Sequence, residues 1–217
     1  PNFEKPNLAE PNKLLFSIVA SSALINLLKK QRDAVGLSMF ADTVRLHTPA
    51  KVNTRHHRRL FHELEKVINI DSLKDKLPTL SLSSLNQIAE RLHKRSMVMI
   101  FTDMIDNSLD LDTLFSAYRH LKYNNHEIIL FHLSEPLTEH QFNFENRPYK
   151  FVDVESGEEI KLNPAFIKKD YQKASSDRLD ELRNKCLQYK IELVEVDINK
   201  GFDQILIAYL LKRQKMF

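Results

Sequence analysis

The stretch Met97-Val-Met-Ile-Phe-Thr-Asp103 decides the fold of this chain. Its first five residues are all apolar, which is typical of a strand that lies in the middle of a parallel sheet and is buried on both faces. Asp103 follows the run directly, so the sequence predicts a carboxylate at the carboxyl end of this strand.

Strands and helices alternate on both sides of this run over the last 120 residues. Such alternation predicts right-handed crossovers and a parallel sheet that carries helices on both faces. We expect strands at 97–102, 127–133 and 191–196, and helices at 83–94, 109–122, 163–189 and 202–212.

Upstream of the run, the pattern predicts a helix over 11–32 and two strands over 34–40 and 43–48. The two strands are joined by a tight turn, so they must be antiparallel. A further helix is expected over 53–67, and a small exposed hairpin over 149–162. The whole chain, residues 1–217, reads as one α/β domain.

The composition excludes several classes of function. The 217 residues carry 32 Lys and Arg against 29 Asp and Glu, a net charge of +3, which argues against nucleic acid as the main partner. The three glycines, Gly36, Gly157 and Gly201, lie far apart. The chain therefore has no G-x-G-x-x-G, no P-loop and no G-x-S-x-G motif.

Cysteine content and apolar stretches bear on the compartment. Cys186 is the one cysteine, which excludes disulfides within the chain and multi-cysteine zinc sites. This fits a reducing compartment, so we expect a cytoplasmic protein. The longest uncharged stretch, 14–28, is shorter than the roughly 20 residues that a bilayer span needs, so no membrane segment is expected here.

Polar residues follow the three expected parallel strands, at Thr102-Asp103, Ser134-Glu135 and Asp197. Ligands of parallel sheets bind outside the carboxyl ends of the strands. Carboxylate and hydroxyl oxygens suit Mg²⁺, Mn²⁺ or Ca²⁺. The alternative is that such residues only cap the following helix, as Asp106, Asn107 or Ser108 would do for the helix that starts near Leu109.

Several segments together resemble one family. They are Lys30-Gln-Arg-Asp-Ala-Val-Gly-Leu37, Phe40-Ala-Asp42, Leu46-His-Thr-Pro49, Ile100-Phe-Thr-Asp-Met104 and Val152-Asp-Val-Glu-Ser-Gly-Glu158. The chain resembles, over nearly its full length, the bacterial von Willebrand factor A-like proteins of unknown function that are encoded beside MoxR-type AAA+ ATPases. The resemblance implies a Rossmann-type, mostly parallel sheet with one antiparallel edge strand.

The resemblance also implies a metal-ion-dependent adhesion site that takes Mg²⁺ or Mn²⁺. Its aspartate falls on Asp103, and its loop threonine falls on Thr79, although Leu80 stands where the family often has an acidic residue. The third part, a D-x-S-x-S motif after the first strand, does not occur in the chain. The site would therefore hold two of its usual parts, which puts metal occupancy in doubt.

The first strand of an A-like domain is central to its sheet, and this sequence begins where the loop after that strand would have ended. Without it, two strands lack a neighbour and buried edges lie open. We expect that the native protein extends upstream of Pro1.

The resemblance favours a non-enzymatic protein-interaction module that acts as an adaptor for a MoxR-type AAA+ ATPase. The alternative is a metal-dependent phosphohydrolase or nuclease using Asp103, Asp106 and Asp197. A third reading is a metal-free scaffold. No nucleophile and base stand at a diagnostic spacing.

Other polar or reactive residues have simpler interpretations. His56-His57-Arg58-Arg59, with His62, is expected to form a solvated helix face rather than a docking patch. His132 is expected to be a hydrogen-bonded core histidine, and Cys186 a small buried residue.

Overall fold

The computed structural model describes residues 12–40, 43–69, 82–103, 111–152 and 159–214. Its centre is a parallel sheet of three strands in the order β3 (Met97–Thr102), β4 (Glu127–Ser134) and β7 (Glu192–Asp197). The predicted parallel pairing is confirmed, since Ile100 lies beside Leu130, and Leu130 lies beside Leu193. The run around Met97–Thr102 is therefore a strand of this sheet, as its sequence indicates.

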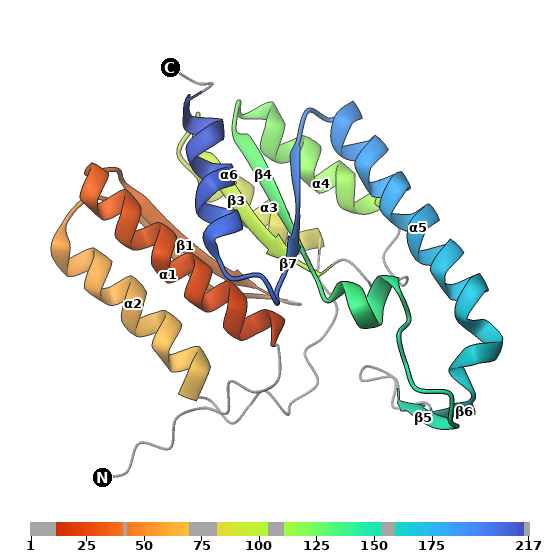
Figure 1. The fold of residues 1–217 in the computed structure, drawn as a ribbon. Coiled ribbons are helices and arrows are strands. Elements are labelled where there is room, and N and C mark those ends of the chain that lie inside the picture. The colour runs from red at the N-terminus through yellow and green to blue at the C-terminus, as the bar shows by residue number, and fades with distance from the viewer. Residues whose placement is uncertain (1–11, 41–42, 70–81, 104–110, 153–158, 215–217) are drawn as a thin grey trace, which may run out of the picture.

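Helices cover both faces of the parallel sheet (Figure 1). On one face, α1 (Lys13–Gln31) and α6 (Asp203–Gln214) pack against Ile129, Phe131 and Leu133 of β4. On the other face, α3 (Leu82–Arg91), α4 (Leu111–Tyr123) and α5 (Pro164–Gln188) pack against Ile128 and Leu130. This alternation along β4 places one hydrophobic core on each side of the sheet.

A second, antiparallel sheet is formed by β1 (Val35–Phe40) and β2 (Val44–Lys51). Helix α2 (Thr54–Asn69) packs on it, and Leu60 and Leu64 of this helix join Ile18, Ile25 and Val35 in a third cluster. Within the described residues, no hydrogen-bonded ladder joins β1 to β3. Among the described residues, the two sheets are therefore separate.

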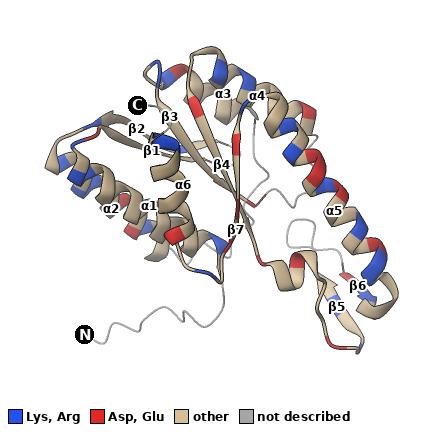
Figure 2. Ribbon diagram, turned by 45° about the horizontal axis from the view of Figure 1, so that its top comes forward, with Lys and Arg blue, Asp and Glu red and all other residues tan. Residues whose placement is uncertain are grey.

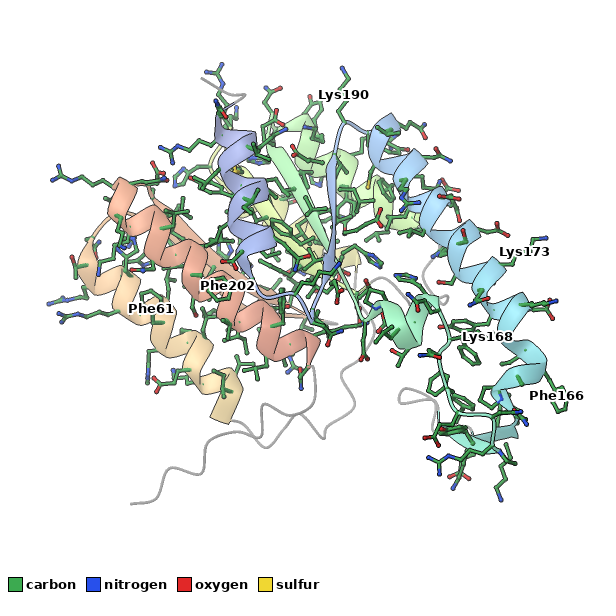
Figure 3. All side chains as sticks on the ribbon, viewed as in Figure 1. Phe61, Phe166, Lys168, Lys173, Lys190 and Phe202 are labelled. Carbon is green, nitrogen blue, oxygen red and sulfur yellow. The ribbon has the colours of Figure 1, made fainter. Side chains whose placement is uncertain are left out.

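The third sheet is the predicted hairpin, β5 (Tyr149–Val152) and β6 (Glu159–Leu162). It lies at one end of the long helix α5, away from the parallel sheet (Figure 1). Aromatic rings fill the space around it, and Phe142 lies 4.4 Å from the Tyr171 ring of α5 and 6.0 Å from the Phe151 ring of β5. Phe166, by contrast, points away from the helix (Figure 3).

Asparagines cap the starts of two of the helices. The Asn12 side chain accepts hydrogen bonds from the amides of Leu14 and Leu15, at 2.9 and 3.1 Å. Asn163 accepts one from the Ala165 amide, and Pro164 occupies the first helical position. These are the bonds that unpaired amides at a helix start require.

The expected solvated helix face on α2 is partly wrong, because His56 and His57 are 8% and 1% exposed. His56 Nε2 lies 2.8 Å from the Val35 carbonyl oxygen, so this histidine ties α2 to β1. Cys186 is buried as expected, and burial raises the pKa of its thiol to about 12. None of the described helices combines the length and apolar character needed to cross a bilayer.

Charged side chains lie mainly on the outer surfaces. Figure 2 shows Lys and Arg interspersed with Asp and Glu along α5. Arg183 of this helix donates to the carboxylate of Glu195 on β7, at 2.7 and 2.9 Å. Charged side chains, including this ion pair, therefore cover the outer edge of β7.

Candidate functional site

The candidate site is the rim at the carboxyl ends of β3 and β4. Asp103 follows the last residue of β3, and its side chain is 63% exposed. The predicted position of this carboxylate at the strand end is therefore confirmed. It faces solvent, where it is free to meet a partner.

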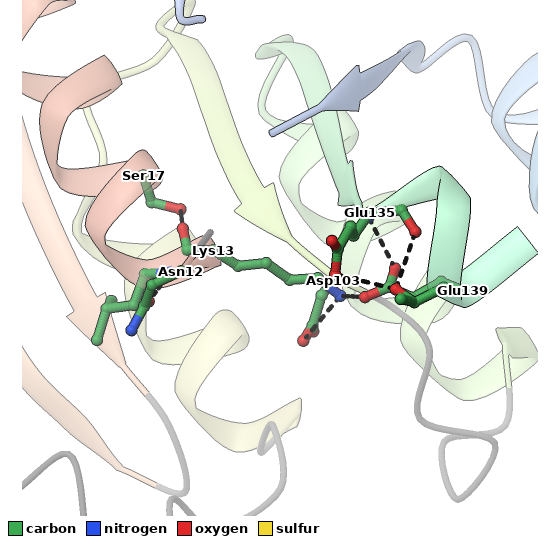
Figure 4. Close-up of polar contacts among 8 residues, drawn as sticks. Asn12, Lys13, Ser17, Asp103, Glu135 and Glu139 are labelled. Atoms are coloured by element: carbon green, nitrogen blue, oxygen red, sulfur yellow. Dashed lines mark hydrogen bonds and ion pairs between the residues drawn. The ribbon is translucent and has the colours of Figure 1, made fainter. Parts of the chain in front are cut away.

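A lysine from α1 connects Asp103 to a second carboxylate (Figure 4). The Lys13 ammonium lies 2.5 Å from Glu139 Oε1 and 3.9 Å from Asp103 Oδ2. Asn12 caps the helix immediately before this lysine, which fixes the first turn of α1 beside the rim. The lysine and Glu139 are each about four-fifths buried, so their ion pair is less screened than a surface pair.

Glu139 is held by the π-helical turn η2 (Pro136–His140), which follows β4. The Glu135 amide donates to Glu139 Oε2 at 3.2 Å, and the Thr138 hydroxyl donates to Glu135 Oε2 at 2.9 Å. π-Helical turns are rare in proteins, and many of those that occur lie at functional sites. Here the turn orients one carboxylate toward Lys13.

Asp197, at the end of β7, has a different role. Its carboxylate accepts hydrogen bonds from the amide and the side chain of Asn199, at 3.0 and 3.2 Å, and lies 3.6 Å from Lys200 Nζ. These contacts stabilise the turn between β7 and α6. The contacts of this residue therefore indicate a structural role in that turn.

A small cavity of about 120 Å³ lies behind the rim. His132 of β4 and His140 of η2 both line it, with ring centroids 6.4 Å apart, and Tyr171 of α5 closes it. Burial lowers the pKa of His132, and a hydrogen bond to the Asp103 backbone acts in the opposite direction. His132 is buried and hydrogen-bonded as expected, although its Nδ1 has no hydrogen-bond partner among the described residues.

The described side chains do not by themselves fit a metal ion. No group of three or more His, Cys, Asp or Glu side chains in the described part of the chain is arranged to hold one. Lys13 also places a positive charge beside Asp103, where a cation would compete with it. Thr79 of the predicted site and Asp106 of the alternative enzyme lie outside the described residues.

The sequence did not indicate Lys13 or Glu139 as site residues. Lys13 is separated from Asp103 by 90 positions and meets it only because α1 packs across the sheet. Glu139 lies in a segment with no helical or strand periodicity, so only Pro136 after the strand signals a turn there.

Comparisons with known proteins agree with this fold. The model of the family described as "Protein of unknown function DUF58" matches residues 9–180. The crystal structure of the conserved hypothetical protein BatB from Bacteroides thetaiotaomicron superposes with a TM-score of 0.56 at 14% sequence identity. This match covers 96% of the present chain and 91% of BatB, and it shows a shared fold. No curated protein matches the chain.

Proposed function

The chain belongs to the DUF58 family of proteins of unknown function, and on that premise we propose that it is a protein-interaction module without catalytic activity. The proposed contact surface is the rim formed by Asp103, Lys13 and Glu139. The observation that carries the proposal is the exposed Asp103 carboxylate beside a largely buried Lys13–Glu139 ion pair. Opposite charges held side by side attract complementary charges of a partner and fix the orientation in which it binds.

The α/β fold supports the same proposal. It is consistent with a von Willebrand A-like fold and with the structure of BatB. In this architecture, the carboxyl ends of parallel strands are the usual place for a ligand. Recognition at the rim needs no proton transfer and no nucleophile, so the proposal requires only the groups that are already in position.

We propose a MoxR-type AAA+ ATPase as the partner, with this chain acting as its adaptor. The support for this partner is the sequence resemblance alone. Its test is binding of the purified ATPase to the immobilised chain by surface plasmon resonance. We expect Asp103→Asn and Lys13→Met each to weaken binding at least tenfold, and higher salt to weaken it further.

Asp170→Asn is the matched control, because Asp170 is exposed on α5 and is not one of the rim residues. It should leave the affinity unchanged. The Asp103 variant should also unfold within about 0.5 kcal/mol of the parent, since an exposed side chain with one long ion pair contributes little. Equal affinity of the parent, Asp103→Asn and Lys13→Met would contradict the proposal.

Metal binding by Asp103 and Thr79 stays a prediction. Calorimetric titration of Mg²⁺ and of Mn²⁺ into the parent and into Asp103→Ala tests it, and equal heats in the two proteins would contradict it. Hydrolysis of a generic phosphodiester with Mn²⁺, lost in Asp103→Ala, would overturn the non-enzymatic proposal and favour the phosphohydrolase or nuclease alternative.

A further inference from the structure

Strand β6 of the small hairpin has an outer edge without a described neighbour. It pairs with β5 along one edge, and no other strand pairs with it among the described residues. The hairpin lies at one end of the molecule, away from the parallel sheet (Figure 1). The outer edge of β6 therefore presents backbone N–H and C=O groups that can pair with a further strand.

The first three residues of β6 are all exposed. They are Glu159, Ile160 and Lys161, and the apolar Ile160 is 58% exposed. Isoleucine is favoured in strands because it packs against its neighbours in the sheet. A hairpin of two strands is also marginally stable on its own. Both facts indicate that this small sheet gains stability when a further strand is added beside β6.

The charges on one face of the hairpin are only partly matched. Lys150 of β5 lies directly opposite Lys161 of β6, a position in which like charges are destabilising. The Lys150 ammonium lies 2.5 Å from Glu159 Oε1 and is thus paired. Lys161 forms no ion pair with the described residues. A carboxylate on the far side of β6 would supply the counter-charge that Lys161 lacks.

The order of charges along β6 is complementary to itself. In Glu159-Ile160-Lys161, the acidic and the basic side chain lie on the same face of the hairpin, because side chains alternate along a strand. When a second β6 lies antiparallel beside the first with the two Ile160 residues opposite each other, each Glu159 lies opposite the Lys161 of the other copy. Opposite charges in this position stabilise a pair of strands.

The same charges disfavour the neighbouring registers. A shift of two residues is the smallest that keeps every side chain on its face. Such a shift places Glu159 opposite Glu159, or Lys161 opposite Lys161. A parallel pair in register also brings like charges together. Of these arrangements, only the antiparallel one centred on Ile160 matches both charges of each copy.

We propose that two copies of the chain associate through their β6 strands, which lie antiparallel with the two Ile160 residues opposite each other. The two hairpins then form one four-stranded sheet with a β5 strand at each edge. The arrangement has two-fold symmetry, as most protein dimers do. Each copy contributes a strand of four residues, so the interface is small. We expect a weak dimer with a dissociation constant of roughly 0.1 mM.

A second copy is favoured over other occupants because β6 carries one charge of each sign. A strongly acidic or strongly basic segment would match one of the two charges and repel the other. A lipid surface or an apolar ligand would bury both charges without a partner, which is costly. The proposal concerns the hairpin alone and does not depend on the role given to Asp103.

Sedimentation velocity of the 217-residue chain, at concentrations on both sides of the expected dissociation constant, measures the association. Glu159→Lys and Lys161→Glu each place like charges opposite each other in the proposed register. We expect each variant alone to dimerise at least about tenfold more weakly than the parent. Glu65→Lys is the matched control, because Glu65 is 69% exposed on α2, far from the hairpin (Figure 1). It should dimerise like the parent.

An equal mixture of Glu159→Lys and Lys161→Glu tests the register itself. In a mixed pair, β6 of one copy carries two positive charges and β6 of the other carries two negative charges. Both facing positions are then ion pairs, so the mixture should dimerise at least as tightly as the parent. The double variant Glu159→Lys/Lys161→Glu should also recover the parent's affinity. Recovery shows that the single variants are folded.

Ile160→Cys locates the contact by a second measurement. The two cysteines lie directly opposite each other at the two-fold axis, where facing Cβ atoms are about 4.5–5.5 Å apart, so mild oxidation should join them after a small adjustment. Lys150→Cys is the control, because its side chain is half exposed but lies on β5, away from the proposed contact. Cys186 is buried and should give little background.

A cross-link that forms with Ile160→Cys and not with Lys150→Cys supports the proposal, even if sedimentation detects little dimer. A chain that stays monomeric and gives no such cross-link overturns it. A dimer that neither charge variant weakens also overturns it, in favour of another surface of the chain. Weakening by both single variants without recovery in the mixture contradicts the register centred on Ile160.

Discussion

At the scale of single residues, His126 makes stability depend on pH. Its side chain is fully buried, its Nδ1 accepts a hydrogen bond from the Ser96 amide at 3.1 Å, and its Nε2 has no partner among the described residues. Burial lowers the pKa of this histidine. Because Nδ1 accepts a hydrogen bond from an amide, it must carry no proton, so this bond also favours the neutral ring in the folded state.

The sign of the effect follows from linkage. Below the ordinary histidine pKa of about 6.5, the unfolded chain binds a proton that the folded chain does not, so acid favours unfolding. We expect the free energy of unfolding to have its full value near pH 7.5 and to decrease as the pH is lowered to 5.5. Each histidine of this kind contributes up to about 1.4 kcal/mol per pH unit.

Urea denaturation at the two pH values measures this loss in the parent and in His126→Asn, whose amide oxygen can replace Nδ1. The variant should lose less stability between pH 7.5 and 5.5 than the parent. His62→Gln is the control, because the His62 side chain is 65% exposed. Equal losses in the parent and in His126→Asn would show that His126 titrates alike in the folded and unfolded chains.

At the scale of elements, Gly36 sets the separation between β1 and β2. A Cβ atom at this position would lie 2.6 Å from the Thr48 carbonyl oxygen and 3.1 Å from the Ala50 amide nitrogen. Both are backbone atoms, so a side chain cannot be accommodated by a rotamer change. We expect Gly36→Ala to destabilise the chain by about 1–3 kcal/mol, the usual cost of overpacking, in chemical denaturation.

The clash that Gly36→Ala would create lies next to two hydrogen bonds of Thr48. The Thr48 hydroxyl accepts from the Leu37 amide at 2.8 Å and donates to the Leu37 carbonyl at 3.1 Å. In Gly36→Ala, exchange of the β1 amides should accelerate more than exchange of the β4 amides. A variant as stable as the parent would mean that the two strands can separate at no cost.

The hairpin of β5 and β6 is attached to α5 through Phe142. This ring is 5% exposed and packs against Phe144, Phe151 and Tyr171, with centroid separations of 4.4 to 6.0 Å. Phe142→Ala should therefore lower the free energy of unfolding by about 3–5 kcal/mol and release the hairpin from the helix. Phe166→Ala, on the same helix as Tyr171, should cost under about 0.5 kcal/mol because Phe166 is 85% exposed.

Differential scanning calorimetry and amide exchange at Tyr149–Val152 measure the two effects separately. If the hairpin is a local unit, its amides should exchange faster in Phe142→Ala while those of β4 do not change. Equal behaviour of the two alanine variants would contradict the role given to the aromatic cluster.

At the scale of the whole molecule, amide hydrogens of the parallel sheet should exchange at different rates in β3 and β4. Strand β4 has a partner on both sides and is buried at every residue after Glu127. Strand β3 has a partner on one side among the described residues and is mostly half-buried. In the 217-residue chain alone, we expect alternate β3 amides to exchange at least about tenfold faster than those of β4. Uniform protection of β3 would show that its edge opposite β4 is already covered.

The elements of the chain could be predicted because their signals are local. Periodicity placed the helices within a few residues of their observed ends. The apolar run at 97–102 predicted both the strand and the position of Asp103. These features depend on neighbours a few residues away, so one sequence is sufficient to show them.

The rim and the cavity between the two sheets could be predicted only in part, since they depend on distant contacts. Lys13 meets Glu139 across 126 positions, a pairing that no spacing rule indicates. His57 lies on a basic stretch that looks solvated, yet tertiary packing buries it. The π-helical turn at Pro136–His140 has no recognisable sequence pattern. An unpaired edge was expected, and β3 has one among the described residues, but the cavity of about 740 Å³ beside it needed the structure.

Helix α1 carries Lys13 in its first turn and Ser21 about 12 Å further along its axis. The same helix thus carries one member of the charged rim and part of the wall of the apolar cavity between the two sheets. If a ligand in this cavity shifts the helix, it also changes the distance from the Lys13 ammonium to the Asp103 and Glu139 carboxylates. Binding at the rim would then change the affinity of the cavity by the same factor, because such coupling is reciprocal.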